Sequence, residues 1–78
     1  MDKTGVTYEI VRHVGDICHY PGGWTKELNR VSWNKGPVKL DIREWDEKHK
    51  YLSRGTTLTE DEARVLVGLL VEELNLKV

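Results

Sequence analysis

The residues best able to do chemistry in this sequence are one cysteine, three histidines and several carboxylates. Cys18 and His19 are adjacent, and adjacent residues of a strand point to opposite faces, which argues against a thiolate–imidazole pair for nucleophilic catalysis. The spacing of Cys18, His13 and His49 does not match a zinc motif. We therefore expect no catalytic residue, no metal site and no cofactor, with a thiol enzyme using Cys18 as the least favoured alternative.

The carboxylates between Asp41 and Glu47 are a second candidate for chemistry. They are interleaved with Arg43, Lys48 and Lys50, which is more typical of surface ion pairs than of paired catalytic carboxylates or a metal site. Gly22, Gly23 and Gly36 are isolated turn residues, so there is no phosphate-binding glycine loop. These patterns predict that the protein is not an enzyme.

The charged residues are segregated along the chain, although the net charge is only -1. Residues 24–54 contain eight Lys and Arg and five Asp and Glu. Residues 55–78 contain two Lys and Arg and five Asp and Glu. A basic segment beside an acidic one can present a local positive field to a polyanion, and a solvated mixed surface would give similar counts.

Length and composition limit the class of protein. The 78 residues predict a single domain over 1–78, and a chain this short usually needs a disulfide, a metal or a partner chain for stability. The lone cysteine excludes an internal disulfide and favours a reducing, cytoplasmic setting. No apolar run approaches the roughly 18 residues of a membrane span, and the first residues do not lead into a signal peptide.

Alternating apolar and polar residues predict four strands, followed by one helix, in an α+β fold with an antiparallel sheet. The strands are expected at residues 6–20, 25–34, 38–45 and 55–58, with a tight turn at 34–37 and a charged loop at 46–54. Gly15 interrupts the alternation of the first strand and indicates a bulge or a break.

The helix begins with a capping box, in which Thr59 and Glu62 satisfy each other's backbone amides. One apolar stripe of this helix is expected to pack on the sheet, against Val38, Leu40 and Ile42. That stripe consists of Ala63, Leu66, Val67, Leu70 and Leu74. A second stripe, Val65, Leu69 and Leu76, lies too far around the helix to reach the same sheet. We predict that it forms a homodimer interface, the alternative being scattered surface leucines.

One helix covers only one face of the sheet, which leaves the other face free for a ligand. Strand parity predicts that Lys26, Arg30 and Ser32 share this face with Lys39, Arg43 and Trp45. Cations for phosphates and flat rings for unstacked bases are what single-stranded nucleic acid requires. The alternative is structural: Trp24 and Trp45 would cap the sheet edges, and Arg43 would pair with Asp41 or Glu44.

Residues 28–45, followed by 54–59 and a helix, resemble the positive cofactor four family of transcriptional coactivators and their bacterial relatives. The resemblance covers about residues 24–74, and residues 23–30 are similar to the bacterial branch. It implies a curved four-stranded sheet, dimerisation through the helices, and single-stranded DNA along the outer sheet. The resemblance implies that Arg43 contacts the DNA backbone or a base, that Trp45 stacks on a base, and that Arg54 reaches the phosphates. Pro37 and Ser53 depart from the coactivator pattern, and a serine-rich regulatory tail is absent from the sequence.

The sequence thus predicts a single-stranded DNA-binding homodimer that acts in transcription, replication or repair, located in the cytoplasm with the nucleoid. The alternatives are RNA as the ligand, and a protein-interaction module that recruits transcription or replication proteins. The predicted nucleic-acid-binding residues are Trp24, Lys26, Arg30, Ser32, Asn34, Lys39, Arg43, Trp45, Lys48, Lys50 and Arg54.

Overall fold

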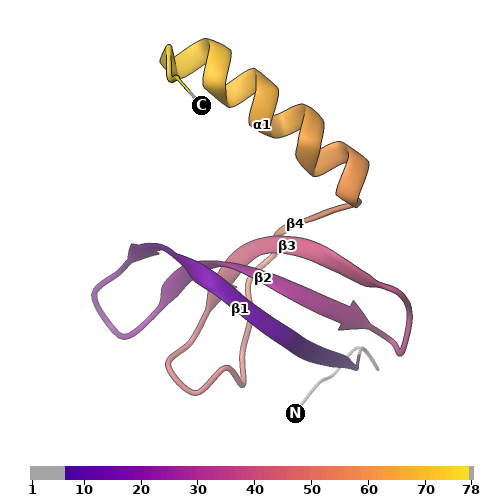
Figure 1. Ribbon diagram of the computed structural model, residues 1–78. Coiled ribbons are helices and arrows are strands. Elements are labelled where there is room, and N and C mark those ends of the chain that lie inside the picture. Colours follow the sequence, from indigo (N-terminus) through magenta and orange to yellow (C-terminus); the bar gives the residue numbers. More distant parts are fainter. Residues whose placement is uncertain (1–6, 78) are drawn as a thin grey trace.

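A computed structural model describes residues 7–77, which form four strands followed by one helix (Figure 1). The elements are β1 (Tyr8–His19), β2 (Thr25–Trp33), β3 (Val38–Trp45), β4 (Thr56–Leu58) and α1 (Glu60–Leu74). The strands make one antiparallel sheet in the order β1-β2-β3-β4. The predicted α+β class, with this sheet and a C-terminal helix, is confirmed. Val6, the predicted start of the first strand, lies outside the described residues.

β1 is bulged three times along its pairing with β2. Ile10 is opposite Val31 and His13 is opposite Asn29, so three steps along β1 match two steps along β2, and the same slip recurs further along the strand. Bulges bend a strand and increase its twist, and the sheet in Figure 1 is strongly curved. The irregularity expected near Gly15 is confirmed, while the other two were not foreseen.

A tight turn joins β2 to β3, as the sequence predicted. Asn34 and Lys35 both have positive φ, 51° and 63°, and Gly36 donates its amide to the Trp33 carbonyl over 2.8 Å. Two consecutive left-handed residues match the twist of an antiparallel hairpin. This turn fixes the register of the two central strands.

The interior lies on the side of the sheet away from α1, and we call this side the inner face. Tyr8 packs on Trp33 and Trp45 with ring centroids 5.7 and 5.2 Å apart, and His49 packs on Trp45 at 5.6 Å. Among the described residues the buried side chains are Glu27, Asn29, Val31, Asp41 and Trp45. The loop between β3 and β4 hangs below this face in Figure 1 and contributes His49 to it.

The helix begins as the capping box predicted. Thr59 Oγ1 accepts the Glu62 amide at 3.1 Å, and Glu62 Oε1 accepts the Thr59 amide at 2.8 Å. At the other end Asn75 takes the left-handed conformation and closes the helix. Within residues 7–77 no helix is long and apolar enough to cross a membrane.

α1 leads away from the sheet instead of lying on it (Figure 1). It has no buried residue, and Val67, Leu70 and Leu74 of the stripe that was expected to pack on the sheet are 58%, 46% and 60% exposed. The prediction that this stripe packs on Val38, Leu40 and Ile42 of the same chain is therefore wrong. A short connection after β4 holds only the first turn of the helix near the sheet, so both apolar surfaces are left open.

Candidate nucleic-acid interface

The β2–β3 register separates the cations that were expected to share one face. Arg30 lies opposite Leu40, whereas Arg43 lies opposite Glu27. Directly opposed residues of an antiparallel pair lie on the same face. Lys26, Arg30 and Ser32 therefore lie on the side of Leu40 and Ile42, which faces α1, while Lys39, Arg43 and Trp45 belong to the inner face. The prediction that these six residues share one face is wrong. The hairpin turn pairs odd-numbered residues of β2 with odd-numbered residues of β3, so the even-numbered residues of β2 lie on the other face.

Arg43 is held within the protein. Its guanidinium donates two 2.7 Å hydrogen bonds to the Asp41 carboxylate and a third, of 3.3 Å, to the Ser53 carbonyl. It also lies 4.5 Å from the Trp33 ring centroid, and its side chain is only 13% exposed. The alternative in which Arg43 pairs with Asp41 is thus confirmed, and this side chain positions β3 and the following loop.

Trp45 offers no surface for a base. It is fully buried between Tyr8 and His49, so the prediction that Trp45 stacks on a ligand is wrong for this structure. Trp24 is half-buried and stands just before β2, where its carbonyl accepts the Tyr20 amide at 2.8 Å. Trp24 therefore keeps an accessible part of its ring.

Two further predicted cations already have partners. Arg30 pairs with Glu60 of α1 at 3.2 Å, and this contact lowers the pKa of Glu60. A hydrogen bond with Tyr20 raises the pKa of Lys26. Arg30 thereby connects the start of α1 to β2.

The predicted polar residues of the turn are engaged in the fold. Ser32 Oγ donates to the Gly36 carbonyl over 2.7 Å. Asn34 binds Thr7 twice, since its amide donates to the Thr7 carbonyl at 2.7 Å and its Oδ1 accepts the Thr7 amide at 2.9 Å. Both side chains stabilise the hairpin and the start of β1.

The remaining predicted cations are exposed: Lys39, Lys48, Lys50 and Arg54. None of them has an ion pair with another of the described residues. Three of the four belong to residues 46–55, which we call the basic loop. This loop also carries Tyr51, an aromatic side chain that is 53% exposed and was missed from the sequence. Its place between Lys50 and Arg54 is the signal that would have identified it.

The basic loop is ordered by its own first residue. Asp46 Oδ1 accepts the amides of Lys50 and Tyr51 at 2.7 and 2.6 Å. The Tyr51 amide is the larger cause of the lowered pKa of Asp46. At the far end Ser53 forms two backbone-directed hydrogen bonds with Glu44. The cations of the loop are thus presented on a defined backbone.

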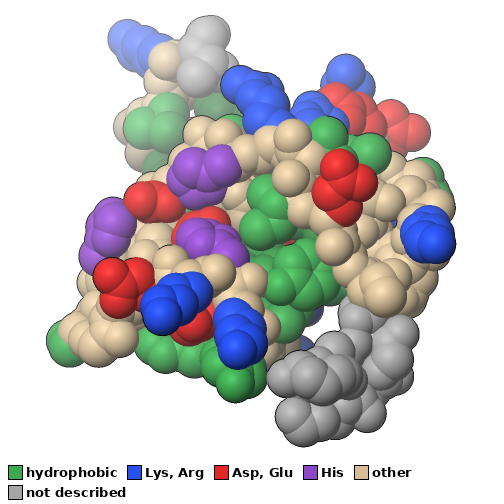
Figure 2. All heavy atoms as spheres, turned by 90° about the horizontal axis from the view of Figure 1, so that it is seen from below, with side chains coloured by type: hydrophobic (Ala, Val, Ile, Leu, Met, Phe, Trp, Pro, Cys, Tyr) green, Lys and Arg blue, Asp and Glu red, His purple; other side chains and the backbone are tan. Residues whose placement is uncertain are grey.

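The inner face also gathers histidines and carboxylates, which are seen together from below in Figure 2. His13, Asp16 and Glu27 each offer a metal-ligating atom, and these atoms lie within 4.8 Å of one another. A hydrogen bond with Asn29 raises the pKa of His13; burial opposes that shift, and the nearby carboxylates of Glu27 and Asp16 add to it. No metal motif was recognisable from the sequence, because His13 and Asp16 share a face only through the bulge between His13 and Gly15.

Comparison with known proteins gives two matches. A family model described as Transcriptional Coactivator p15 (PC4) matches residues 21–69, a span that includes the basic loop. An uncharacterized protein of Treponema pallidum (strain Nichols) is 40% identical over 63 residues, which cover 81% of this chain and 74% of that protein. The family resemblance seen in the sequence is confirmed.

Proposed function

The chain belongs to the PC4 family of transcriptional coactivators, and we propose that it binds single-stranded DNA with little sequence preference. The observation that carries this proposal is the basic loop, where Lys48, Lys50 and Arg54 are exposed beside the exposed ring of Tyr51. A surface that combines cations with an open aromatic ring has what an unpaired strand needs.

In this proposal the cations contact phosphates and the rings contact bases. Lys39, Lys48, Lys50 and Arg54 neutralise the backbone, so the affinity falls as salt rises. Tyr51 and the accessible part of Trp24 supply stacking surfaces, each worth about 1–3 kcal/mol per base. These contacts are made to features that all bases share, which accounts for a low sequence preference.

Arg43 and Trp45 support the interface without touching the ligand. Arg43 holds the Ser53 carbonyl at one end of the basic loop, and Trp45 packs against His49 within it. Their substitution is expected to displace the loop. Arg43 and Trp45 thus have a positioning role, and neither is proposed to be catalytic.

We also propose that the protein works as a homodimer. The predicted interface residues Val65, Leu69 and Leu76 are 64%, 58% and 52% exposed, and Val67, Leu70 and Leu74 of the stripe that was expected to pack on the sheet are exposed as well. Val31 and Trp45 are the only buried hydrophobic residues in the described chain, which is a small core for its length. A second copy that covers both helix stripes and the open sheet face would supply the missing burial.

A homodimer of this kind would hold unpaired strands during transcription, replication or repair, in the cytoplasm and in association with the nucleoid. The test is fluorescence anisotropy of a labelled 20-nucleotide strand, compared with the same sequence as duplex DNA and as RNA, at two salt concentrations. We expect a preference for the single strand that weakens with salt.

The variant for this test is Lys48→Ala/Lys50→Ala, which is expected to weaken binding. Arg64→Ala is the matched control, because it removes a cation from α1, away from the loop. Absence of binding at low salt would reject the proposal and favour a protein-interaction module. Tighter binding of RNA than of DNA would show that RNA is the preferred ligand of the same proposed interface.

A further inference from the structure

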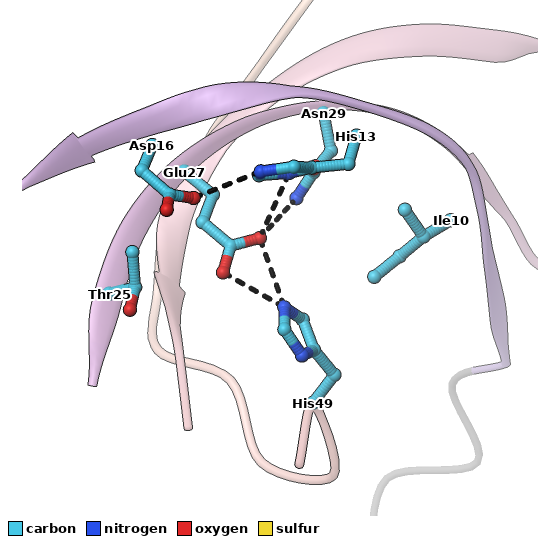
Figure 3. A pocket seen from close by; sticks show the side chains of 7 residues that line it. All are labelled: Ile10, His13, Asp16, Thr25, Glu27, Asn29 and His49. Carbon is cyan, nitrogen blue, oxygen red and sulfur yellow. Dashed lines mark hydrogen bonds and ion pairs between the residues drawn. The ribbon is translucent and has the colours of Figure 1, made fainter. Parts of the chain in front are cut away.

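The inner face contains a pocket that the proposed function does not use. It has a volume of about 420 Å³ and is lined by residues of β1, β2 and the basic loop (Figure 3). These residues are Ile10, His13, Asp16, Thr25, Glu27, Asn29 and His49. In Figure 3 the side chains of His13, Asp16 and His49 converge on the Glu27 carboxylate and the region beside it.

One of the three bulges of β1, between His13 and Gly15, builds this cluster. His13 is opposite Asn29 and Asp16 is opposite Glu27, so residues three apart in β1 lie on the same face as residues two apart in β2. In a regular strand His13 and Asp16 would point to opposite sides of the sheet. This bulge therefore brings an imidazole and a carboxylate side by side, with His13 Nε2 2.9 Å from Asp16 Oδ1.

Glu27 is a buried carboxylate whose polar partners are all neutral or titratable. Its side chain is 4% exposed, and it contacts His49 Nε2 at 2.8 Å, Asn29 Nδ2 at 3.0 Å and His13 Nδ1 at 3.5 Å. No lysine or arginine among the described residues pairs with it. A buried carboxylate needs compensating positive charge, and in this pocket only protons on histidine or a bound cation can provide it.

The surroundings of His13 match those of a metal ligand. Asn29 donates its Nδ2 to Glu27, so its Oδ1 is the acceptor that faces His13 Nδ1 at 2.7 Å. This contact makes Nδ1 a donor, so Nε2, which lies 2.9 Å from Asp16 Oδ1, is the nitrogen that would exchange its proton for a cation. Metal-binding histidines commonly have their second nitrogen held in this way.

We propose that His13, Asp16 and Glu27 bind a divalent transition-metal ion of the Zn²⁺ type, with His49 holding the Glu27 carboxylate in place. Two ligands about 2.1 Å from Zn²⁺ in a tetrahedral site lie roughly 3.4 Å apart, and the 4.8 Å spread of the three ligand atoms is within reach of small side-chain rotations. Mixed imidazole and carboxylate ligands favour such an ion over Mg²⁺ or Ca²⁺. Because His49 of the basic loop contacts Glu27, the bound ion would connect β1 and β2 directly and would reach that loop through the Glu27 carboxylate.

The test is isothermal titration of the full chain, without an affinity tag, with Zn²⁺ at pH 7.5. We expect one ion per chain, with Mg²⁺ giving no heat of binding. Co²⁺ is expected to give the visible absorption of a four-coordinate site. Asp16→Asn and His13→Gln should each weaken Zn²⁺ at least tenfold. Asp16 is exposed, so its variant should fold even if changes at Glu27 do not.

Cys18→Ser is the matched control, because Cys18 is an exposed alternative ligand in the same strand, and it is expected to leave the affinity unchanged. Absence of Zn²⁺ binding at millimolar concentration, or binding that survives both pocket variants, would overturn the proposal. Loss of binding in the Cys18 variant would do so too. The test uses no nucleic acid, so its outcome is separate from that of the proposed function.

Discussion

The guanidinium of Arg43 binds the carboxylate of Asp41, two residues earlier in β3, through two hydrogen bonds of 2.7 Å. Asp41 is fully buried and also accepts the Thr57 hydroxyl at 2.9 Å, which connects β3 to β4. This pair explains why Arg43, an arginine that the family resemblance implied to contact the ligand, belongs to the fold and not to its exposed surface.

Arg43→Ala is expected to destabilise the protein by about 3–5 kcal/mol, because it leaves the buried Asp41 carboxylate without its partner. Asp41→Asn/Arg43→Gln removes both charges and should cost less than the single substitution. Urea unfolding at one fixed protein concentration measures both. An Arg43→Ala protein of normal stability that has lost affinity for DNA would instead make Arg43 a direct contact.

Gly55 is required by the close approach of its backbone to β3. A Cβ at this position would collide with the Arg43 Cβ and the Ile42 carbonyl oxygen. Gly55→Ala should therefore lower the free energy of unfolding by about 1–3 kcal/mol and disturb the end of the basic loop. Gly15→Ala is the control, since nothing lies within 4 Å of its added Cβ. Equal stability of the two variants in thermal unfolding would contradict the packing described for Gly55.

Local signals in the sequence predicted the elements, because the capping box of Thr59 and the alternation of β3 depend only on neighbouring residues. The pairing between strands could not be read in this way. The left-handed pair Asn34 and Lys35 sets which parity of β2 shares a face with Arg43, and a one-residue error moves every side chain to the other face.

The candidate site was partly hidden for the same reason. The bulge between His13 and Gly15 puts His13 and Asp16 on one face of β1, where regular alternation would separate them. The burial of Trp45 could not be predicted from its residue type either. A tryptophan ring can stack on a base, but Trp45 is fully buried in the aromatic cluster with Tyr8 and His49. The direction of α1 could not be predicted from its apolar stripes, because neither stripe is buried against the sheet of the same chain.

Tyr51 should contribute to nucleic-acid binding through its ring. Tyr51→Ala is expected to lower the affinity for a single strand by about 1–2 kcal/mol, or roughly 5- to 30-fold, because a stacked base is lost. Tyr51→Phe keeps the ring and should bind as the natural protein does. Anisotropy titrations at one salt concentration compare the three proteins. If both variants bind normally, the stacking role belongs elsewhere, with Trp24 the next residue to change.

Leu69→Lys should convert the proposed dimer into a monomer, because it puts a charge into the exposed apolar stripe of α1. Sedimentation equilibrium across the micromolar range gives the mass of each protein. Glu73→Gln, an exposed polar change on the same helix, is the control and should remain dimeric. A natural protein that sediments as a monomer throughout this range would reject the homodimer.

The Asp46 carboxylate should order the basic loop in a pH-dependent way. Its pKa is lowered in the folded chain, first by the Tyr51 amide, so its stabilising effect is present above the ordinary carboxyl pKa and is lost as the pH falls through the folded value. An NMR titration is expected to place this pKa below the usual value of about 3.9. At neutral pH Asp46→Ala should speed hydrogen exchange of the Lys50 and Tyr51 amides and weaken DNA binding, while Asp46→Asn keeps an acceptor oxygen and should change less. Normal exchange in the alanine variant would mean that contacts other than Asp46 hold the loop.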